Sequence, residues 1–243
     1  MKTGIIVQAR CGSIRLPSKV LLKLEDKTIL EHTISQIKKT KFNKKIIIAT
    51  TAKKKDKKII DIAKKNNCDF FCGSEKNVLN RYYEAAKKFK IKNIIRICSD
   101  SPFIDPSILE KAFKIFKKKK YDYVSNIIRP TYPAGMSVEI FNFTSLKKCN
   151  ESITDPEEKE HVTPFIYRNP KIFSLKNFST KKKFSNYRFS VDYWEDFLAC
   201  VEIQKIVRQL KISKLSISIL VKIIDNNPFI KKINQEKKTV LRY

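Results

Sequence analysis

Residues 4–19 read GIIVQARCGSIRLPSK, an apolar run that passes directly into a basic loop. Residues 4–7 predict a buried strand, and the loop after them carries Arg10, Arg15 and Lys19 around one Gly-Ser pair. Exposed backbone N–H groups and converging positive charge at a strand end are suited to holding phosphates. The loop is not a P-loop, because no second glycine precedes a Lys-Ser or Lys-Thr pair, and one glycine is too few for a dinucleotide fingerprint. The alternative is a basic surface loop between two strands.

The strand at the start of this stretch is the first of several short apolar runs that alternate with helical patterns. Strands are predicted at residues 4–7, 45–49, 70–72, 94–97 and 123–125. Each run is mainly apolar, as expected for parallel strands that are covered on both faces. Helices are predicted at residues 29–39, 57–65, 78–89 and 107–118, with N-terminal capping residues Thr28, Asp56, Asn77 and Asp105. This alternation predicts an α/β fold with a doubly wound, mostly parallel sheet.

The alternation breaks after about residue 127. Further strands are predicted at residues 137–142, around 172–175 and at 188–191, and helices at 194–210 and 216–225. A length of 243 residues with 42% hydrophobic side chains fits one large domain, residues 1–243, that carries a small insertion at about 128–185. No apolar run approaches the roughly 20 residues that span a bilayer, and the early first strand leaves no room for a signal peptide. We therefore expect a cytoplasmic protein with no membrane partner.

The formal net charge of +28 raises the hypothesis of a nucleic-acid-binding protein. The chain has 43 lysines but only nine arginines, and arginine is the residue that makes bidentate contacts with nucleic acids. The lysines are spread along nearly every predicted helix, which indicates a compositional drift toward A/T-rich codons. We therefore expect no nucleic-acid partner. A positive field would still attract anionic substrates.

The six cysteines form no Cys-x-x-Cys pair and no Cys/His cluster, and they are interpreted as small buried hydrophobic residues. Cys11 is the exception, because it lies among the cations of the basic loop. Its thiol could have a lowered pKa there, although we expect a neutral role.

Two aspartates each follow a predicted strand. Asp100 stands in RICSDSP (residues 96–102) and Asp192 in FSVDYWED (residues 189–196). In open α/β sheets ligands bind at the carboxyl ends of the strands, and Mg²⁺ prefers one or two carboxylates together with phosphate oxygens. The two residues are thus a candidate Mg²⁺ pair. The alternatives are turn or capping residues, and acids that interact with the dipole of the following helix.

Three further motifs contain candidate binding residues. GSEKNVLNR (residues 73–81) follows a strand and opens a helix, so that Ser74 and Arg81 could meet a nucleotide; the alternative for Arg81 is a surface salt bridge. YPAGMSVE (residues 132–139) and EKEHVTP (residues 158–164) complete the set. A lone histidine on a helix is more often structural, which is the alternative for His161 and our interpretation of His32.

The basic loop closely resembles that of the CMP-sugar synthetases, the cytidylyltransferases that activate acidic sugars such as sialic and 3-deoxy-octulosonic acids. Within that group the later motifs are similar to those of the SpsF-like branch, which is named for spore coat polysaccharide biosynthesis. The resemblance covers roughly residues 3–205. Asn77 and Ser137 depart from it, since the branch usually has aspartate at both positions. The Ser137 departure leaves the identity of the sugar open, and the Asn77 departure leaves open any role that depends on a charge there.

The resemblance implies a fold of the nucleotide-diphospho-sugar transferase (GT-A-like) type, and the reaction CTP + acidic sugar → CMP-sugar + pyrophosphate, for surface polysaccharide biosynthesis. It implies Mg²⁺ on Asp100 and Asp192, a homodimer, and a role of residues 128–185 in acceptor binding or dimerisation. Arg15, Lys19 and Asp100 are the implied catalytic residues. The implied nucleotide-binding residues are Ala9, Arg10, Gly12, Ser13, Arg15, Lys19, Ser74 and Arg81. The implied acceptor-sugar residues are Tyr132, Gly135, Glu139, Glu160 and His161.

Two other functions compete with this one. A glycosyltransferase of the same fold would consume an activated sugar, but such enzymes usually carry an Asp-x-Asp metal motif, and none occurs in this sequence. A non-catalytic, basic nucleic-acid-binding protein is favoured only by the net charge. No residue of the sequence identifies the sugar, and selection of cytosine is implied by the resemblance alone.

Overall fold

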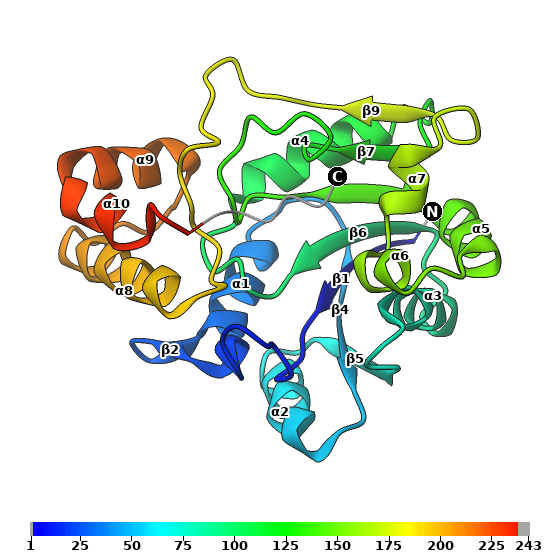
Figure 1. The fold of residues 1–243 in the computed structure, drawn as a ribbon, viewed down its shortest axis with the longest axis horizontal. Helices are drawn as coiled ribbons and strands as arrows, with labels where there is room; N and C mark the ends of the chain where they lie inside the picture. Colours follow the sequence, from blue (N-terminus) through cyan, green and yellow to red (C-terminus); the bar gives the residue numbers. More distant parts are fainter. Residues whose placement is uncertain (1, 238–243) are drawn as a thin grey trace.

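A seven-stranded sheet forms the centre of the computed structural model, which describes residues 2–237 (Figure 1). Met1 and residues 238–243, the ends of the predicted domain, lie outside the described residues. The strand order is β5-β4-β1-β6-β8-β7-β9. The strands are β1 (Thr3–Gln8), β4 (Lys45–Thr51), β5 (Asp69–Gly73), β6 (Asn93–Cys98), β7 (Tyr123–Ser125), β8 (Glu139–Asn142) and β9 (Leu175–Asn177). A separate hairpin pairs β2 (Lys23–Leu24) with β3 (Lys27–Thr28).

The sheet is parallel where the sequence alternates strand and helix. β1 pairs in parallel with both β4 and β6, and β4 pairs in parallel with β5. β8, between β6 and β7, is antiparallel to both, so it is the strand that runs against the others, and β7 keeps the direction of β6. Both β8 and β9 come from the predicted insertion and join the central sheet. The prediction of a mostly parallel α/β sheet is confirmed.

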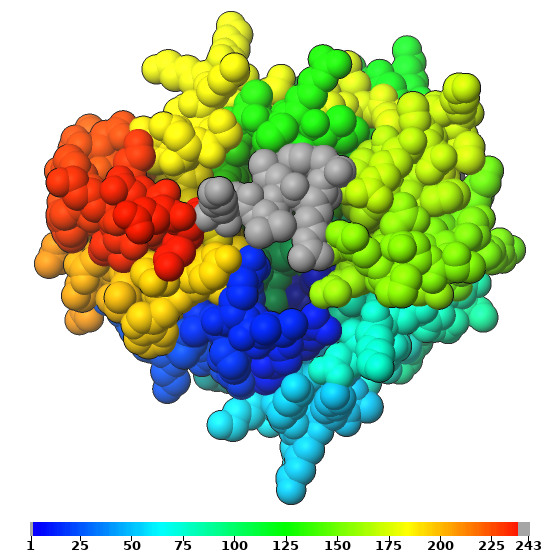
Figure 2. All heavy atoms as spheres, in the orientation of Figure 1, coloured from blue at the N-terminus to red at the C-terminus, as the bar shows by residue number. Residues whose placement is uncertain are grey.

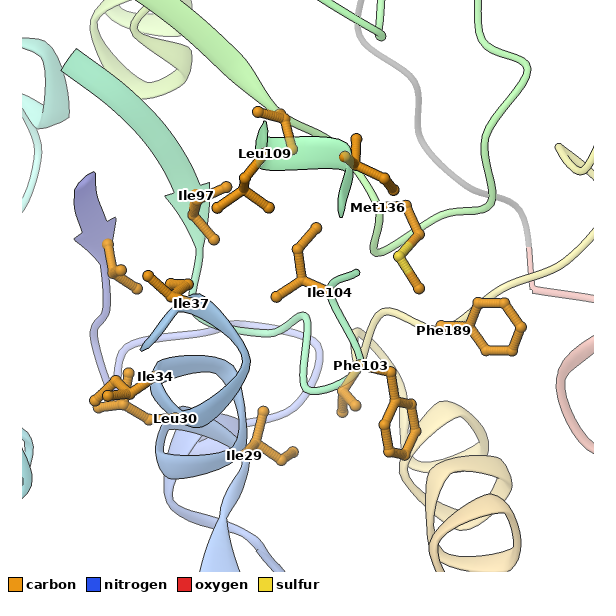
Figure 3. Close-up of a cluster of buried hydrophobic side chains, with 14 of the residues drawn as sticks. Ile29, Leu30, Ile34, Ile37, Ile97, Phe103, Ile104, Leu109, Met136 and Phe189 are labelled. Atoms are coloured by element: carbon orange, nitrogen blue, oxygen red, sulfur yellow. The ribbon is translucent and has the colours of Figure 1, made fainter. Parts of the chain in front are cut away.

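Helices cover both faces of the sheet, because its central strands are buried on both sides. The helices are α1 (Ile29–Lys38), α2 (Lys57–Lys65), α3 (Val78–Lys88), α4 (Pro106–Phe116), α5 (Phe143–Ser152), α6 (Pro156–His161), α7 (Pro164–Arg168), α8 (Trp194–Gln209), α9 (Ile217–Asn226) and α10 (Pro228–Asn234). One core includes side chains of α1, α2, α4 and α8, and the other includes side chains of α3, α5 and α7. Figure 3 shows part of the first core, where Ile34 and Ile37 of α1 lie near Ile97 of β6. Among the described residues, no helix has the length and apolar character needed to cross a membrane.

Three of the four predicted helix caps are present. Thr28 and Glu31 form a capping box at the start of α1, the Asn77 side chain accepts from the Asn80 N–H, and Asp105 caps α4. Asp56 is different. It stands at the N-terminus of α2, after the single turn η2 (Lys54–Asp56), but its side chain makes no capping bond.

One predicted strand is wrong and another is shifted. Residues 188–191 are extended but make only an isolated bridge, between Arg188 and Ala134, so they do not form a ladder strand. The strand expected around 172–175 begins only at Leu175, because residues 169–173 form a turn in which the Phe173 N–H donates to the Asn169 carbonyl. Asp192 therefore does not follow a strand of the sheet.

Candidate active site

A cavity of about 550 Å³ opens at the carboxyl edge of β1 and β6, where the parallel strands end. Figure 2 shows the hollow between blue atoms of the N-terminal segment and yellow-green atoms of the α5–α7 region. Its lining residues include Gln8, Ala9, Arg10, Ser13, Arg15, Lys19, Val78, Arg81, Arg96, Asp100, Ser137, Glu139, Glu160, His161, Thr163, Tyr167 and Asp192. Segments far apart in the sequence thus contribute to a single site.

Asp56, which follows the neighbouring strand β4, holds the basic loop in place. The Cys11 backbone N–H donates to Oδ1 of Asp56 at 2.7 Å, and the Thr51 hydroxyl donates to its Oδ2. Asp56 is fully buried, which explains why it does not serve as the helix cap. Burial and the adjacent Asp56 raise the pKa of the Cys11 thiol to about 11. The pKa of Cys11 is thus raised, and not lowered as the nearby cations suggested.

Lys19 lies between the two candidate metal ligands. Its Nζ donates to Oδ2 of Asp100 at 2.6 Å, to Oδ1 of Asp192 at 2.9 Å and to the Val191 carbonyl at 2.7 Å. Burial alone would lower the pKa of Lys19, but the charges of Asp100 and Asp192 outweigh it and raise that pKa above its ordinary value. Both carboxylates are thus within hydrogen-bonding distance of one nitrogen, although Asp192 does not follow a strand.

A backbone hydrogen bond helps to bring Asp192 into the site. The Val191 N–H donates to the Asp100 carbonyl at 2.9 Å, which ties the extended segment 188–191 to the end of β6. Gly135 makes that approach possible, because an added Cβ would lie 2.7 Å from the backbone of Phe189 and Ser190. Its φ of +89° also favours glycine.

Asp192 is surrounded by cations. Beyond Lys19, it accepts from Arg15 at 2.7 Å and from Arg188 at 2.9 Å. Burial would raise the pKa of Asp192, but Lys19, Arg15 and Arg188 together hold it below its ordinary value. The Arg15 guanidinium also lies 4.9 Å from the centre of the Tyr193 ring. The carboxylate is therefore kept ionised at neutral pH.

Asp196, fully buried in the first turn of α8, organises this segment. Its two oxygens accept from Nε and NH2 of Arg188 at 2.7 and 2.9 Å. They also accept from the backbone N–H groups of Asp192 and Tyr193 and from the Asn234 side chain of α10, at 2.9, 3.0 and 3.0 Å. One carboxylate thus fixes the Asp192 turn, its arginine and the last described helix.

On the opposite wall, Glu139 is buried in a polar network. It forms an ion pair with Arg96 and accepts from the hydroxyls of Tyr123, at 2.6 Å, and Thr163. Burial would lower the pKa of Arg96, but Glu139 raises it far above its ordinary value. Near the mouth, Arg10 pairs with Glu160 at 3.0 Å. His161 lines the same wall, where α6 ends.

Arg81 is buried, with 1% of its surface exposed, so the surface salt bridge considered for it is wrong. Its NH1 donates to the Ser74 carbonyl at 2.5 Å, and burial lowers its pKa below the ordinary value. The hydroxyl oxygen of Ser74 accepts a hydrogen bond from the Asn77 N–H, at 3.0 Å. Ser74 therefore supports the segment beside the cavity, and Arg81 is the part of the motif that lines it.

Three more predicted site residues do not line the cavity. Tyr132 packs edge-on against Phe178 and its hydroxyl lies 3.3 Å from Nζ of Lys111. Gly135 packs against residues 189–190, and Gly12 lies beside the side chains of Glu75 and Lys55. His32 is structural, as expected, because its ring bonds the Leu24 carbonyl at 3.0 Å.

Sequence reasoning missed four residues that shape the site: Asp56, Arg96, Arg188 and Asp196. Arg96 had a detectable signal, because it is the one charged residue inside an otherwise apolar predicted strand. Asp196 and Asp56 look like ordinary acids near helix N-termini, and their buried partners come from distant segments. Nothing local distinguishes Arg188.

The donor set fits a magnesium ion that is completed by substrate. Among residues 2–237, no three His, Cys, Asp or Glu side chains are grouped as a self-contained metal site. Asp100 and Asp192 converge on one point, and Mg²⁺ is commonly held by one or two carboxylates plus substrate phosphates. Lys19 supplies the positive charge between them in this structure.

Comparisons with known proteins place the chain among its relatives. A model of the cytidylyltransferase family matches residues 4–229. The uncharacterized protein MJ1063 of Methanocaldococcus jannaschii is 38% identical, with 96% of this chain and 95% of that protein covered. The spore coat polysaccharide biosynthesis protein SpsF of Bacillus subtilis is 29% identical, with 79% and 82% covered. The 3-deoxy-manno-octulosonate cytidylyltransferase of Chloroherpeton thalassium is 28% identical, with 54% and 52% covered.

Solved structures show the same likeness. A cytidylyltransferase from Leptospira borgpetersenii superposes with a TM-score of 0.90 at 32% identity, covering 98% of this chain and 99% of the other. A CMP:2-keto-3-deoxy-manno-octonic acid synthetase complexed with CTP superposes with a TM-score of 0.64, covering 86% and 99%. At 15% identity the second likeness concerns the fold alone, and it agrees with the predicted nucleotide-diphospho-sugar transferase type.

Proposed function

We propose that this chain, which belongs to the cytidylyltransferase family, transfers CMP from CTP to an acidic sugar and releases pyrophosphate. The activity of a nucleotidyltransferase follows from the family. The nature of the acceptor is our proposal, supported by relatives named for 3-deoxy-manno-octulosonate and for spore coat polysaccharide biosynthesis. One observation carries the proposal: Lys19, at the end of the basic loop, lies between Asp100 and Asp192.

The mechanism begins with an exchange of partners. Arg10, Arg15 and Lys19 hold carboxylates in this structure, and an incoming triphosphate competes for those cations with oxygens of higher charge. Mg²⁺, when bound to Asp100 and Asp192, neutralises phosphate charge. The three cations thus exchange carboxylate partners for phosphate oxygens when the nucleotide binds.

The transfer itself needs positioning and electrostatic stabilisation. A sugar hydroxyl attacks the α-phosphorus of CTP in line and gives up its proton to solvent, while the bond to the bridging oxygen of the β-phosphate breaks and pyrophosphate leaves. Arg15 and Lys19 stabilise the charge that develops on the phosphate oxygens. Asp100 lies beside Lys19, and the polar wall of Glu139, Glu160 and His161 would orient the hydroxyls of the acceptor.

The biological setting is part of the same proposal. A CMP-sugar made in the cytoplasm, where CTP is supplied, would serve surface polysaccharide biosynthesis, and a homodimer is the expected assembly. Ser137 faces the cavity and is exposed, at the position where the SpsF-like branch usually has aspartate. A hydroxyl there would accept a different pattern of sugar hydroxyls from a carboxylate.

A panel of acidic sugars tests the proposal. Purified protein with Mg²⁺, each sugar and each of CTP, UTP, ATP and GTP should release pyrophosphate fastest with CTP and one class of acidic sugar. EDTA should abolish the release. Equal turnover with all four nucleotides, or full activity in EDTA, would reject the proposal. Consumption of a CMP-sugar or other nucleotide-sugar without pyrophosphate exchange would instead favour a glycosyltransferase.

A further inference from the structure

Buried polar atoms without partners gather at the cavity. Among residues 2–237, six buried side-chain polar atoms have no hydrogen-bond partner, and three of them, on Gln8, Arg81 and Arg96, belong to cavity-lining residues. Buried polar groups are almost always hydrogen-bonded in folded proteins, so each exception needs a reason. An absent ligand is a sufficient reason for atoms that border a cavity.

Two of the three atoms are available for a ligand of their own. The Arg96 guanidinium is already neutralised by Glu139. Arg81 forms no salt bridge within the described part of the chain, and its Nε–H has no acceptor although 1% of the residue is exposed. Oε1 of Gln8 is equally without a donor. Two residues that line the cavity thus carry one unused acceptor and one unused donor, both buried.

Gln8 and Arg81 lie next to the basic loop. Gln8 is the last residue of β1, two residues before Arg10. Side chains alternate along a strand, so Gln8 lies on the same face as Ile6, whose core also contains Val78 and Leu79 of α3. Val78 lines the cavity as well, and Arg81 is one turn further along α3. An apolar wall with a donor and an acceptor beside it suits a flat heterocycle better than a sugar.

We propose that Gln8 and Arg81 read the hydrogen-bonding edge of the nucleobase and select cytosine over uracil, an inference that rests on the proposed function. Cytosine offers a 4-amino donor beside the N3 and O2 acceptors. Oε1 of Gln8 accepts from the amino group, and Arg81 donates to the ring acceptors. Uracil reverses the first two positions, with O4 as an acceptor and N3–H as a donor.

Arg81 strengthens the selection against uracil. A rotated Gln8 amide could donate to O4 of uracil, since the two ends of an amide exchange by a flip. Arginine has donors only, so Arg81 would still face the N3–H of uracil. Guanine is rejected for the same reason, because it also presents O6 and N1–H. Adenine shares the donor and acceptor order of cytosine, so its exclusion depends on ring size.

The test measures nucleotide affinity without an acceptor sugar. Calorimetry in Mg²⁺ buffer would compare CTP and UTP for the wild type, for Gln8→Met and for Gln36→Met. Gln36 is a matched control, because its Oε1 is also buried without a partner but it lies on α1 and does not line the cavity. Loss of one hydrogen bond predicts that Gln8→Met weakens CTP binding and lowers the CTP/UTP ratio by about tenfold. The control should keep the wild-type ratio.

A modified nucleotide tests the same contact without relying on a variant. The pyrimidin-2-one ribonucleoside triphosphate lacks only the 4-amino group, so it should bind the wild type about tenfold more weakly than CTP. Gln8→Met should bind the two nucleotides equally. Arg81→Lys, which keeps the charge, should lower the CTP/UTP ratio as well.

Two failures are distinguishable. A wild type that binds CTP and UTP equally, an unchanged ratio in Gln8→Met, or full affinity for the nucleotide without the amino group would overturn this inference and leave the proposed function intact. An effect of Gln8→Met on the KM of the acceptor sugar alone would overturn it too. A wild type that binds none of the nucleotides would contradict the proposed function itself.

Discussion

Lys19 is the residue on which the site depends most. A side chain that looks like part of an exposed basic loop is in fact 9% exposed and bridges two carboxylates. Two carboxylates that share a site without a cation cannot both remain ionised easily, so the lysine lets Asp100 and Asp192 coexist. Arg15, in contrast, keeps 40% of its side chain exposed.

At this scale we predict different outcomes for the two cations. Arg15→Ala should lower kcat/KM at least about a hundredfold and leave stability unchanged, because it removes a charge from the transition state but no buried contact. Lys19→Ala should lose at least as much activity and also destabilise the fold. Thermal unfolding and pyrophosphate release measure the two effects, and Lys23→Ala, at an exposed position of β2, is the control.

The destabilisation by Lys19→Ala should depend on pH. In the wild type the pKa of Asp192 is lowered, so its contribution to stability is present above the ordinary aspartate pKa of about 4 and is lost as the pH falls. Without Lys19 that pKa rises, and protonation relieves the repulsion between the carboxylates. The difference in Tm should therefore be large at pH 8 and small near pH 4. A difference that grows toward pH 4 would contradict this account.

The element that distinguishes this site is the extended segment 188–196. Sequence rules placed Asp100 correctly, because ligands gather at the carboxyl ends of parallel strands and β6 is such a strand. The same rule also placed Asp192 at the site, but the reason was wrong, because Asp192 does not follow a strand of the sheet. Asp192 reaches the site through the Val191–Asp100 backbone bond and the buried Asp196, and these are tertiary contacts that no local pattern reveals.

Asp196 gives the element-scale prediction. Asp196→Asn replaces an acceptor-only carboxylate that satisfies Arg188 and two backbone N–H groups, so the Asp192 turn should loosen. We expect a lower Tm and a Mg²⁺ requirement raised by about tenfold, the size seen when groups that support a metal ligand are removed. Asp225→Asn is the control, since Asp225 lies on the surface of α9 and accepts a hydrogen bond from the Tyr187 hydroxyl. A lower Tm with an unchanged Mg²⁺ requirement would show that Asp196 is only structural.

At the scale of the whole molecule, much of the fold was predictable and one wall of the site was not. The strands β1, β4, β5 and β6 and their helices follow from local apolar patterns and caps. The wall formed by β8 and α6 depends on long-range contacts, because β8 runs antiparallel to its neighbours in the sheet. Tyr132 and Gly135 were assigned to the site from the resemblance alone, and they do not line the cavity. Long-range pairing of short strands leaves little trace in a single sequence.

The charge of +28 also belongs to this scale. Lysines that are spread over the surface give attraction to polyanions without a shaped binding face. Filter binding to RNA should therefore be weak, independent of sequence, and lost between about 50 and 200 mM salt, as for contacts made through phosphates alone. Tight, sequence-selective binding that persists at 200 mM salt would instead favour a nucleic-acid-binding protein.

The most direct test of the central claim is a double-mutant cycle on the two carboxylates that meet at Lys19. Mg²⁺-dependent pyrophosphate release from CTP would be measured for the wild type, Asp100→Asn, Asp192→Asn and the double variant. If both residues act through one metal-dependent unit, each single variant should lose most of the activity and the double variant little more. Excess Mg²⁺ should partly rescue the single variants. Losses that add fully, with no rescue by Mg²⁺, would contradict the shared site.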